Sequence, residues 1–448
     1  MRSTTSIAST EGIRSIADPH QYDEQMLYTP LHRLLGEAPG PITDAMIDAA
    51  IGQKLEEGQE LDFKTRLPEQ KAMRSDDIVK DITAFANAGG GVLVYGVEDH
   101  EKVAIGRTDA GELNENYDRS LQQLCTNAIT PPVLGVKAYA VGAEPTRAVV
   151  IVVPPTVDSP HMFFSNEKFA VPLRVNADTI WLRESQIATA YRARFESASR
   201  AQRELEDLYE QMAETLNPES GAVLVGVARP RTPSVISGRR DSDEARSIAL
   251  SATLLARWWL AGNGKYHPLE DVAIYSERPG LRSWVMPANG DSEEWRAAHA
   301  AIFDDGSLGL AWRAGGHRHG ARGDMLSGWT VRVPAIEGFV GALLALVHAA
   351  AEQRSAGEVE VMIGVEWNAP EGKRLPLRFV EKDDVETSPK TLTGKRFRRV
   401  VHTVDPSASE KDFIQAAIEI ATDCVNQIGI KAPRTLQRQL PRRPPRVY

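Results

Sequence analysis

Apolar and polar residues alternate between two spacings in the first half of the chain. Apolar residues between positions 46 and 55 recur at helical spacing after Thr43, whose hydroxyl suits a helix N-cap. Residues 60–64 alternate with the period of a strand. The same patterns predict helices over 25–35, 75–87 and 113–127, strands over 92–97, 133–141 and 147–153, and a hairpin of 173–175 with 179–182. Because helices and strands alternate along the chain, we predict an α/β fold.

A long charged helix over 186–212, rich in Arg and Glu, is typical of an element that bridges two domains. Beyond it, strands are predicted over 223–227, 283–286, 309–313, 330–333 and 359–365, and helices over 245–260, 335–352 and 409–427. We therefore predict two α/β domains. The predicted boundaries are a flexible arm (1–40), a first domain (41–195), a linking helix (186–216), a second domain of unknown type (217–430) and a basic tail (431–448).

Composition limits where such a chain works. Hydrophobic residues make up 42% and charged residues 25%, as in globular proteins. No run of about eighteen apolar residues occurs, and the first residues lack an apolar signal core, so neither a membrane span nor secretion is expected. Cys125 and Cys424 are too few for a disulfide framework, which favours a cytoplasmic location. Because the net charge is -9, nucleic-acid binding would need a local basic patch.

Three short pieces of sequence carry the candidate chemistry. They are EGQELDFK (57–64), DITAFANAGGGVLVYGVED (81–99) and AIGR (104–107). The strand alternation places Leu61 and Phe63 toward a core and Asp62 and Lys64 on the other face. Clustered carboxylates can hold Mg²⁺ or Mn²⁺ for phosphodiester cleavage, and a lysine can meet the phosphate. The residues alone leave a second interpretation open, in which Asp62 and Lys64 form an ordinary surface ion pair.

The order and spacing of these pieces resemble the Schlafen-type AlbA-like domain family. The matching residues are Glu57, Asp62, Phe63 and Lys64, then Ala84, Phe85, Ala86, Asn87, Gly90 and Gly91, and then Gly96, Val97, Asp99 and Gly106. The resemblance covers about residues 45–195 and implies an α/β domain that is often labelled DNA-binding or ATP-binding in bacterial proteins.

In animal Schlafen proteins, domains of this type look like nucleases for transfer and ribosomal RNA. The resemblance implies Glu57, Asp62 and Asp99 as catalytic ligands of Mg²⁺ or Mn²⁺, with Lys64 assisting; the family's second acid is usually Glu. It implies nucleic-acid binding with metal-dependent endoribonuclease activity, RNA favoured over DNA, and a role in defence or stress response. Since the animal proteins pair two copies of the fold, it also implies a homodimer.

The alternative is a non-enzymatic regulatory or interaction module that binds DNA, a nucleotide or a protein, with structural acids. In the turn after residue 86, Asn87 and the N–H groups of Gly90 and Gly91 could bind a ligand, or the glycines could simply end the helix. No GxxxxGK[ST] motif occurs, so ATP binding by a P-loop is not supported.

Basic residues near the predicted hairpin are the candidate nucleic-acid contacts. Arg174, Asn176, Trp181 and Arg183 could lie against a nucleic-acid backbone, or the hairpin could be a solvated edge with Trp181 in the core. His161 is expected to be a loop residue, and His317 and His319 lack a zinc framework. Further basic clusters lie at 239–240, 313–322, 395–399 and in the tail, each a candidate track or a solvated loop.

Overall fold

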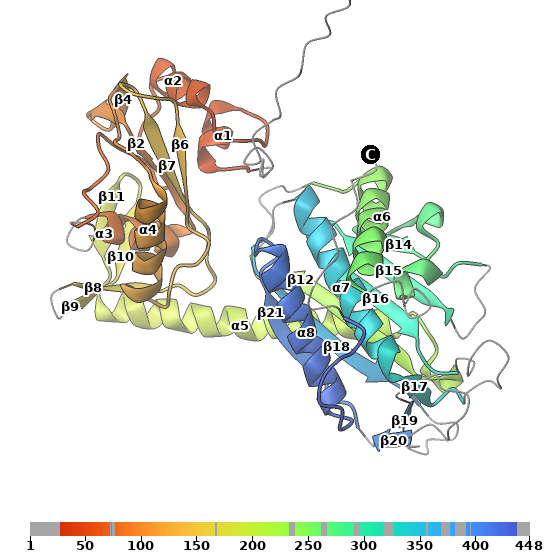
Figure 1. Cartoon of the computed structure of the whole chain (residues 1–448). Helices are drawn as coiled ribbons and strands as arrows, with labels where there is room; N and C mark the ends of the chain where they lie inside the picture. Colours follow the sequence, from red (N-terminus) through yellow and green to blue (C-terminus); the bar gives the residue numbers. More distant parts are fainter. Residues whose placement is uncertain are drawn as a thin grey trace, which may run out of the picture.

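The computed structural model consists of two lobes joined by one long helix (Figure 1). It describes residues 27–436 except 72, 74–76, 166–167, 233–237, 261–266, 291–295, 317–326, 355–356, 369–376, 381–390 and 395. We call residues 27–183 the N-lobe and residues 217–436 the C-lobe. Helix α5 (Glu184–Ala213) runs from one to the other. With 39% helix and 28% strand, the structure confirms the predicted α/β class.

A four-stranded sheet forms the centre of the N-lobe. Its order is β1 (Leu61–Lys64), β2 (Gly91–Tyr95), β7 (Ala148–Val153) and β6 (Lys137–Val141). Strand β1 runs parallel to β2 because α3 (Asp77–Ala88) connects them as a crossover, whereas the other neighbours are antiparallel. The two strands that carry the candidate motif therefore end at the same edge of the sheet.

Helices cover both faces of this sheet. On one face, α1 (Pro30–Leu35) and α2 (Asp44–Gly52) pack on Leu61 and Phe63, which confirms the predicted alternation of β1. On the other face lie α3 and α4 (Glu115–Asn127). Residues 27–40, expected to belong to a flexible arm, include α1 with its fully buried Leu31, and residues 1–26 lie outside the described residues.

Short hairpins complete the N-lobe. They are β3 (Val97–His100) with β4 (Val103–Arg107), β10 (Pro172–Val175) with β11 (Asp178–Trp181), and a three-stranded unit of β5 (Ile129–Thr130), β8 (Met162–Ser165) and β9 (Lys168–Ala170). Strand β3 follows β2 after a single residue, Gly96. The chain reverses later, at Glu101 and Lys102, which take positive φ angles of 51° and 67°.

The C-lobe is built on a seven-stranded antiparallel sheet. Its order is β13 (Arg278–Gly280), β14 (Ser283–Met286), β15 (Ala298–Phe303), β16 (Leu308–Arg313), β12 (Val223–Pro230), β18 (Val359–Glu366) and β21 (Val400–Val404). A small second sheet contains β17 (Thr330–Arg332), β19 (Leu377–Val380) and β20 (Thr391–Gly394). Short 3-10 turns occur at η1 (Pro218–Ser220), η3 (Pro268–Asp271) and η4 (Ile274–Ser276).

Two layers of helix enclose the large sheet. Helices α6 (Ser242–Trp259), α7 (Val333–Gln353) and α8 (Glu410–Asn426) cover one face, and the second half of α5 covers the other. Helix α7 is long and apolar enough to cross a membrane. However, 89% of its most apolar stretch is buried inside the lobe, as in the core helix of a globular domain.

Candidate functional site

Asp62 lies at the centre of the candidate site, on the face of β1 that α3 covers. Its side chain is only 3% exposed. Oδ1 lies 2.7 Å from Nη2 of Arg174, and Oδ2 lies 2.6 Å from Nζ of Lys64. The expected surface ion pair with Lys64 is thus a contact of a buried acid, because β1 is an edge strand whose polar face the β10–β11 hairpin approaches.

Arg174 reaches Asp62 from β10 and is itself buried, with a side chain 4% exposed. Its Nε donates to the carbonyl of Gly58 at 2.9 Å, and Nη2 donates to the carbonyl of Leu61 at 3.3 Å. Its guanidinium carbon lies 4.9 Å from the ring centre of Phe85 on α3. A side chain held in this way is not available to a nucleic-acid backbone, so Arg174 takes a different role from the predicted one.

Glu57 lies next to the same guanidinium, with Oε2 4.0 Å from Nη2 of Arg174. Its Oε1 accepts a hydrogen bond of 3.1 Å from the backbone N–H of Phe63. Burial raises the pKa of Glu57 above its usual value, and the nearby Asp62 carboxylate raises it further. Glu57 therefore lines the buried site of Arg174 and is not a freely solvated carboxylate at a helix end.

Lys64 balances this acidic group. Burial alone would lower the pKa of Lys64, but the adjacent Asp62 carboxylate outweighs burial and holds the pKa above its usual value. Asp81 of α3 also acts on Lys64 and is one acid that the sequence analysis missed. Asp81 is 4% exposed, and burial raises its pKa. Its presence in the motif DITAFANAGGG was the available signal.

Asp99, the third predicted metal ligand, is exposed on β3, beside a bulge between Glu98 and Asp99. It is close enough to raise the pKa of Glu57 slightly. Divalent ions need several free oxygen ligands around one point. Here Arg174 and Lys64 contact both oxygens of Asp62, and among the described residues no group of three His, Cys, Asp or Glu side chains is suited to a metal. As arranged, Glu57, Asp62 and Asp99 do not fit Mg²⁺ or Mn²⁺.

The last turn of α3 and the glycine turn after it also serve the fold. The Asn87 amide donates to the carbonyls of His161 and Pro172, and its oxygen accepts from the N–H of His161 at 2.6 Å. A Cβ on Gly90 would lie 2.8 Å from backbone atoms of residues 153 and 155, and one on Gly91 would lie 2.1 Å from the ring of Phe85. These close approaches require glycine, so the extra glycines have a packing reason.

His161 is equally occupied. Its Nδ1 lies 2.8 Å from the carbonyl of Pro131, and its Nε2 lies 3.2 Å from Oγ1 of Thr156. Burial lowers its pKa below the usual value, which favours the neutral ring. This fits the expected structural role of a loop histidine.

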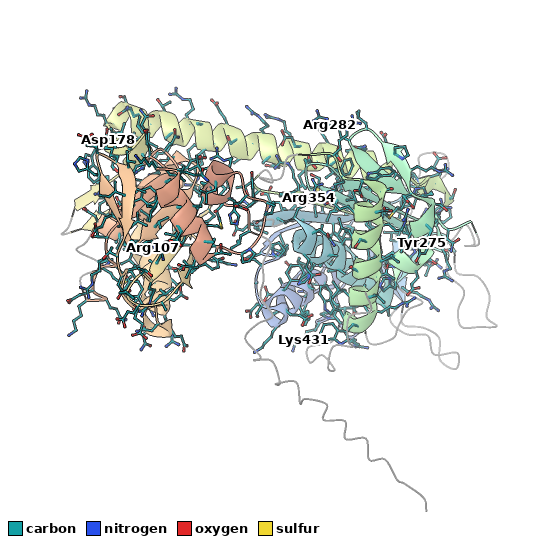
Figure 2. The ribbon with its side chains drawn as sticks, turned by 90° about the horizontal axis from the view of Figure 1, so that it is seen from above. Arg107, Asp178, Tyr275, Arg282, Arg354 and Lys431 are labelled. Carbon is teal, nitrogen blue, oxygen red and sulfur yellow. The ribbon has the colours of Figure 1, made fainter. Side chains whose placement is uncertain are left out.

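The outer side of the β10–β11 hairpin, unlike the side that carries Arg174, is exposed. Trp181 was expected in the core in one interpretation, but it is 51% exposed and touches Phe163 at a ring distance of 6.0 Å. Arg183 is exposed where α5 begins, and Asn176 takes the positive-φ position of the hairpin turn. Asp178 pairs with Lys102 at 2.7 Å and lies at the outer edge of the N-lobe beside the start of α5 (Figure 2).

Of the basic clusters predicted in the second half, several described arginines are held within the C-lobe. Arg240 and Arg313 are each 5% exposed. Arg399 pairs with Glu210 at 2.5 Å and lies over the ring of Tyr209. Residues 317–326, Lys395 and residues 437–448 of the basic tail lie outside the described residues.

Known proteins resemble part of the chain. Two solved structures are similar with a TM-score of 0.24 each. The N-terminal domain of a RecG-related protein from Nitrosomonas europaea is 14% identical, and the match covers 30% of this chain and 89% of that one. The DIP2311 protein from Corynebacterium diphtheriae is 16% identical, with 48% of this chain and 33% of that one covered. No curated protein matches the chain.

A family model described as "Schlafen, AlbA_2" matches residues 57–183. This range includes the acidic strand, the glycine turn and both strands of the β10–β11 hairpin. The family match suggests nucleic-acid binding and confirms the resemblance drawn from the sequence motifs. Residues 57–183 are therefore similar to the Schlafen AlbA_2 family, whose model matches this part of the chain.

Proposed function

We propose that the N-lobe is a nucleic-acid-binding module whose buried acids are structural and which does not cleave its ligand. The observation that carries the proposal is the pairing of Asp62 with both Arg174 and Lys64. A carboxylate bound in this way lacks the free oxygens that a catalytic metal would require. The family match to residues 57–183 supports nucleic acid as the ligand.

The outer side of the β10–β11 hairpin is the proposed contact surface. Trp181, half exposed, offers a flat ring on which a base can stack, and Arg183 offers a cation to the adjacent phosphate. Stacking on a side chain requires an unpaired base, so a single strand fits this surface better than a duplex. We propose RNA as the preferred strand, which rests on the family resemblance alone.

Fluorescence anisotropy with a labelled single-stranded RNA, its DNA equivalent and a duplex tests the proposal. The RNA should bind most tightly and the duplex most weakly. Trp181→Ala should weaken binding about 5- to 150-fold, since base–aromatic stacking contributes about 1–3 kcal/mol per base. Equal affinity of wild type and Trp181→Ala would show that the nucleic acid does not bind at this hairpin.

A cleavage assay tests the second half of the proposal. Wild-type protein is incubated with total RNA and Mn²⁺, and intact RNA is expected. Asp99→Asn is the matched variant, because Asp99 is exposed and its replacement leaves the buried ion pairs in place. Cleavage by wild type that Asp99→Asn abolishes would restore the nuclease assignment and overturn the structural role given to the acids.

A further inference from the structure

The stretch of α5 from Tyr191 to Arg203 carries an exposed face that neither lobe covers. No residue from Phe195 to Glu204 is buried, although α5 connects the two lobes along this stretch. Tyr191, Arg192, Phe195, Arg200 and Arg203 line one shallow surface, together with a single acid, Glu196. Their spacing of three and four residues places them on one side of the helix. This side chain pattern is unusual for a solvated helix, because its centre is aromatic.

Phe195 is 65% exposed. Its ring stacks on that of Tyr191, with ring centres 6.3 Å apart and an angle of 24° between the planes. An exposed phenylalanine of this kind has no role in the core of either lobe. A flat aromatic pair is a surface on which bases stack.

The arginines beside this aromatic pair have no partner among the described residues. Arg192, Arg200 and Arg203 have neither an ion pair nor a hydrogen bond in the part of the chain that the structure describes. By contrast, Arg194 on the opposite side of the helix pairs with Asp158 at 2.8 Å. Residues 183–203 contain five arginines and two glutamates, in a chain whose net charge is -9. This local positive charge is complementary to a polyanion.

We infer that this face of α5 binds the continuation of a single-stranded nucleic acid, with Arg192, Arg200 and Arg203 on phosphates and Tyr191 and Phe195 stacked on bases. The inference rests on the proposed function, since the strand would first contact Trp181 and Arg183, where α5 begins. From residue 183 to residue 203 an α-helix extends about 30 Å, which is long enough to follow several nucleotides. The N-lobe alone would therefore hold only one end of the ligand.

Oligonucleotides of two lengths separate this inference from the proposed function. A strand of about six nucleotides should occupy the hairpin surface only, and one of about sixteen should reach along α5. Wild-type protein should bind the longer strand more tightly and with a steeper dependence on salt. Absence of binding to either strand would overturn the proposed function and this inference together.

The triple variant Arg192→Gln, Arg200→Gln and Arg203→Gln tests the phosphate contacts. Its slope of log affinity against log salt should fall by about 2 for the longer strand, at about 0.7 per phosphate contact, and stay unchanged for the shorter one. Unchanged binding of both strands would overturn the inference and leave the proposed function standing. A loss of affinity for the shorter strand as well would contradict the assignment of these arginines to the distal part of the ligand.

A matched control removes three cations elsewhere. The control combines Arg119→Gln, Arg278→Gln and Lys411→Gln, which replace exposed residues on α4, β13 and α8. It changes the net charge by the same amount as the triple variant on α5. This control should keep wild-type affinity for the longer strand. An equal loss in the control would reduce the effect to net charge and overturn the inference.

Phe195→Ala tests the aromatic pair without changing the charge. Binding of the longer strand should weaken about 5- to 150-fold with the salt slope unchanged, because stacking is not electrostatic. Wild-type affinity of Phe195→Ala would remove the stacking contact from the inference.

Discussion

The two ends of α5 belong to one helix but differ in charge and in burial. The last ten residues of α5 are acidic, with four acids and no basic residue over 204–213, and they pack Leu205, Tyr209 and Met212 into the C-lobe. Residues 183–203, with five arginines and two glutamates, are basic and leave Phe195 in solvent. A helix needs only one apolar side to be anchored. Apolar and aromatic residues on a stretch without a partner therefore point to a ligand rather than to the fold.

Two acids of this acidic stretch are paired with arginines of the C-lobe. Glu204 pairs with Arg229, and Glu210 pairs with Arg399. Nothing comparable occupies Arg192, Arg200 and Arg203 among the described residues. The comparison teaches that charge on a helix identifies a binding surface only when its partners within the fold have been accounted for.

Replacement of matched aromatic residues tests this comparison most strongly. Tyr209 is fully buried and its hydroxyl donates to Glu366 at 2.9 Å, so Tyr209→Ala should lower the free energy of unfolding by about 3–5 kcal/mol. Phe195→Ala should change it by less than about 0.5 kcal/mol. Urea denaturation of both variants measures the difference. Similar losses in the two would mean that Phe195 is packed in solution.

Arg174 offers the same contrast for a buried arginine. Arg174→Met keeps the aliphatic contact with Phe85 but leaves Asp62 without its main partner, which should cost about 3–5 kcal/mol of unfolding free energy. The double variant Arg174→Met with Asp62→Leu should recover part of that loss, because no unpaired charge remains buried. Chemical denaturation would contradict the assigned role if the single variant were as stable as wild type.

Asp81 adds a pH dependence to the N-lobe. Burial raises its pKa in the folded state, so the folded protein binds more protons than the unfolded chain between the usual and the raised value. Its contribution to stability therefore falls as the pH rises through that window and stays lower above it. Asp81→Asn should melt at a higher temperature than wild type at neutral pH, and the difference should vanish below a pH of about 4. A lower melting temperature at neutral pH would show that Asp81 stabilises the fold as a charged partner of Lys80 and Lys64.

The smallest expected effect concerns the exposed arginines. Arg200→Gln should leave the free energy of unfolding within about 0.5 kcal/mol of wild type, because Arg200 is exposed and has no ion pair among the described residues. Calorimetry at low salt is the most sensitive measurement. A clear destabilisation would indicate that an ion pair of Arg200 stabilises α5.

Much of the fold could be predicted from local patterns. Periodicity located α5, α6, α7 and α8 to within a few residues, and alternation set the faces of β1. Many strands were missed, since they are short or carry weak apolar patterns that pairing in a sheet stabilises. They are β3, β4, β5, β8 and β9 in the N-lobe and β13, β15, β19, β20 and β21 in the C-lobe. In the candidate site, Glu57, Asp62 and Lys64 were found because their motif is local, whereas Asp81 was overlooked within an amphipathic helix.

The sequence by itself determined the α/β class, the Schlafen AlbA_2 region, the linking helix and the acidic residues at the edge of the first sheet. Only the tertiary structure decided what those acids contact. Arg174 is separated from Asp62 by more than a hundred residues, and no local spacing indicates that its guanidinium, rather than a metal, faces that carboxylate. The same reason applies to α5. Whether an arginine on a helix is paired or free depends on which distant residues the fold brings beside it.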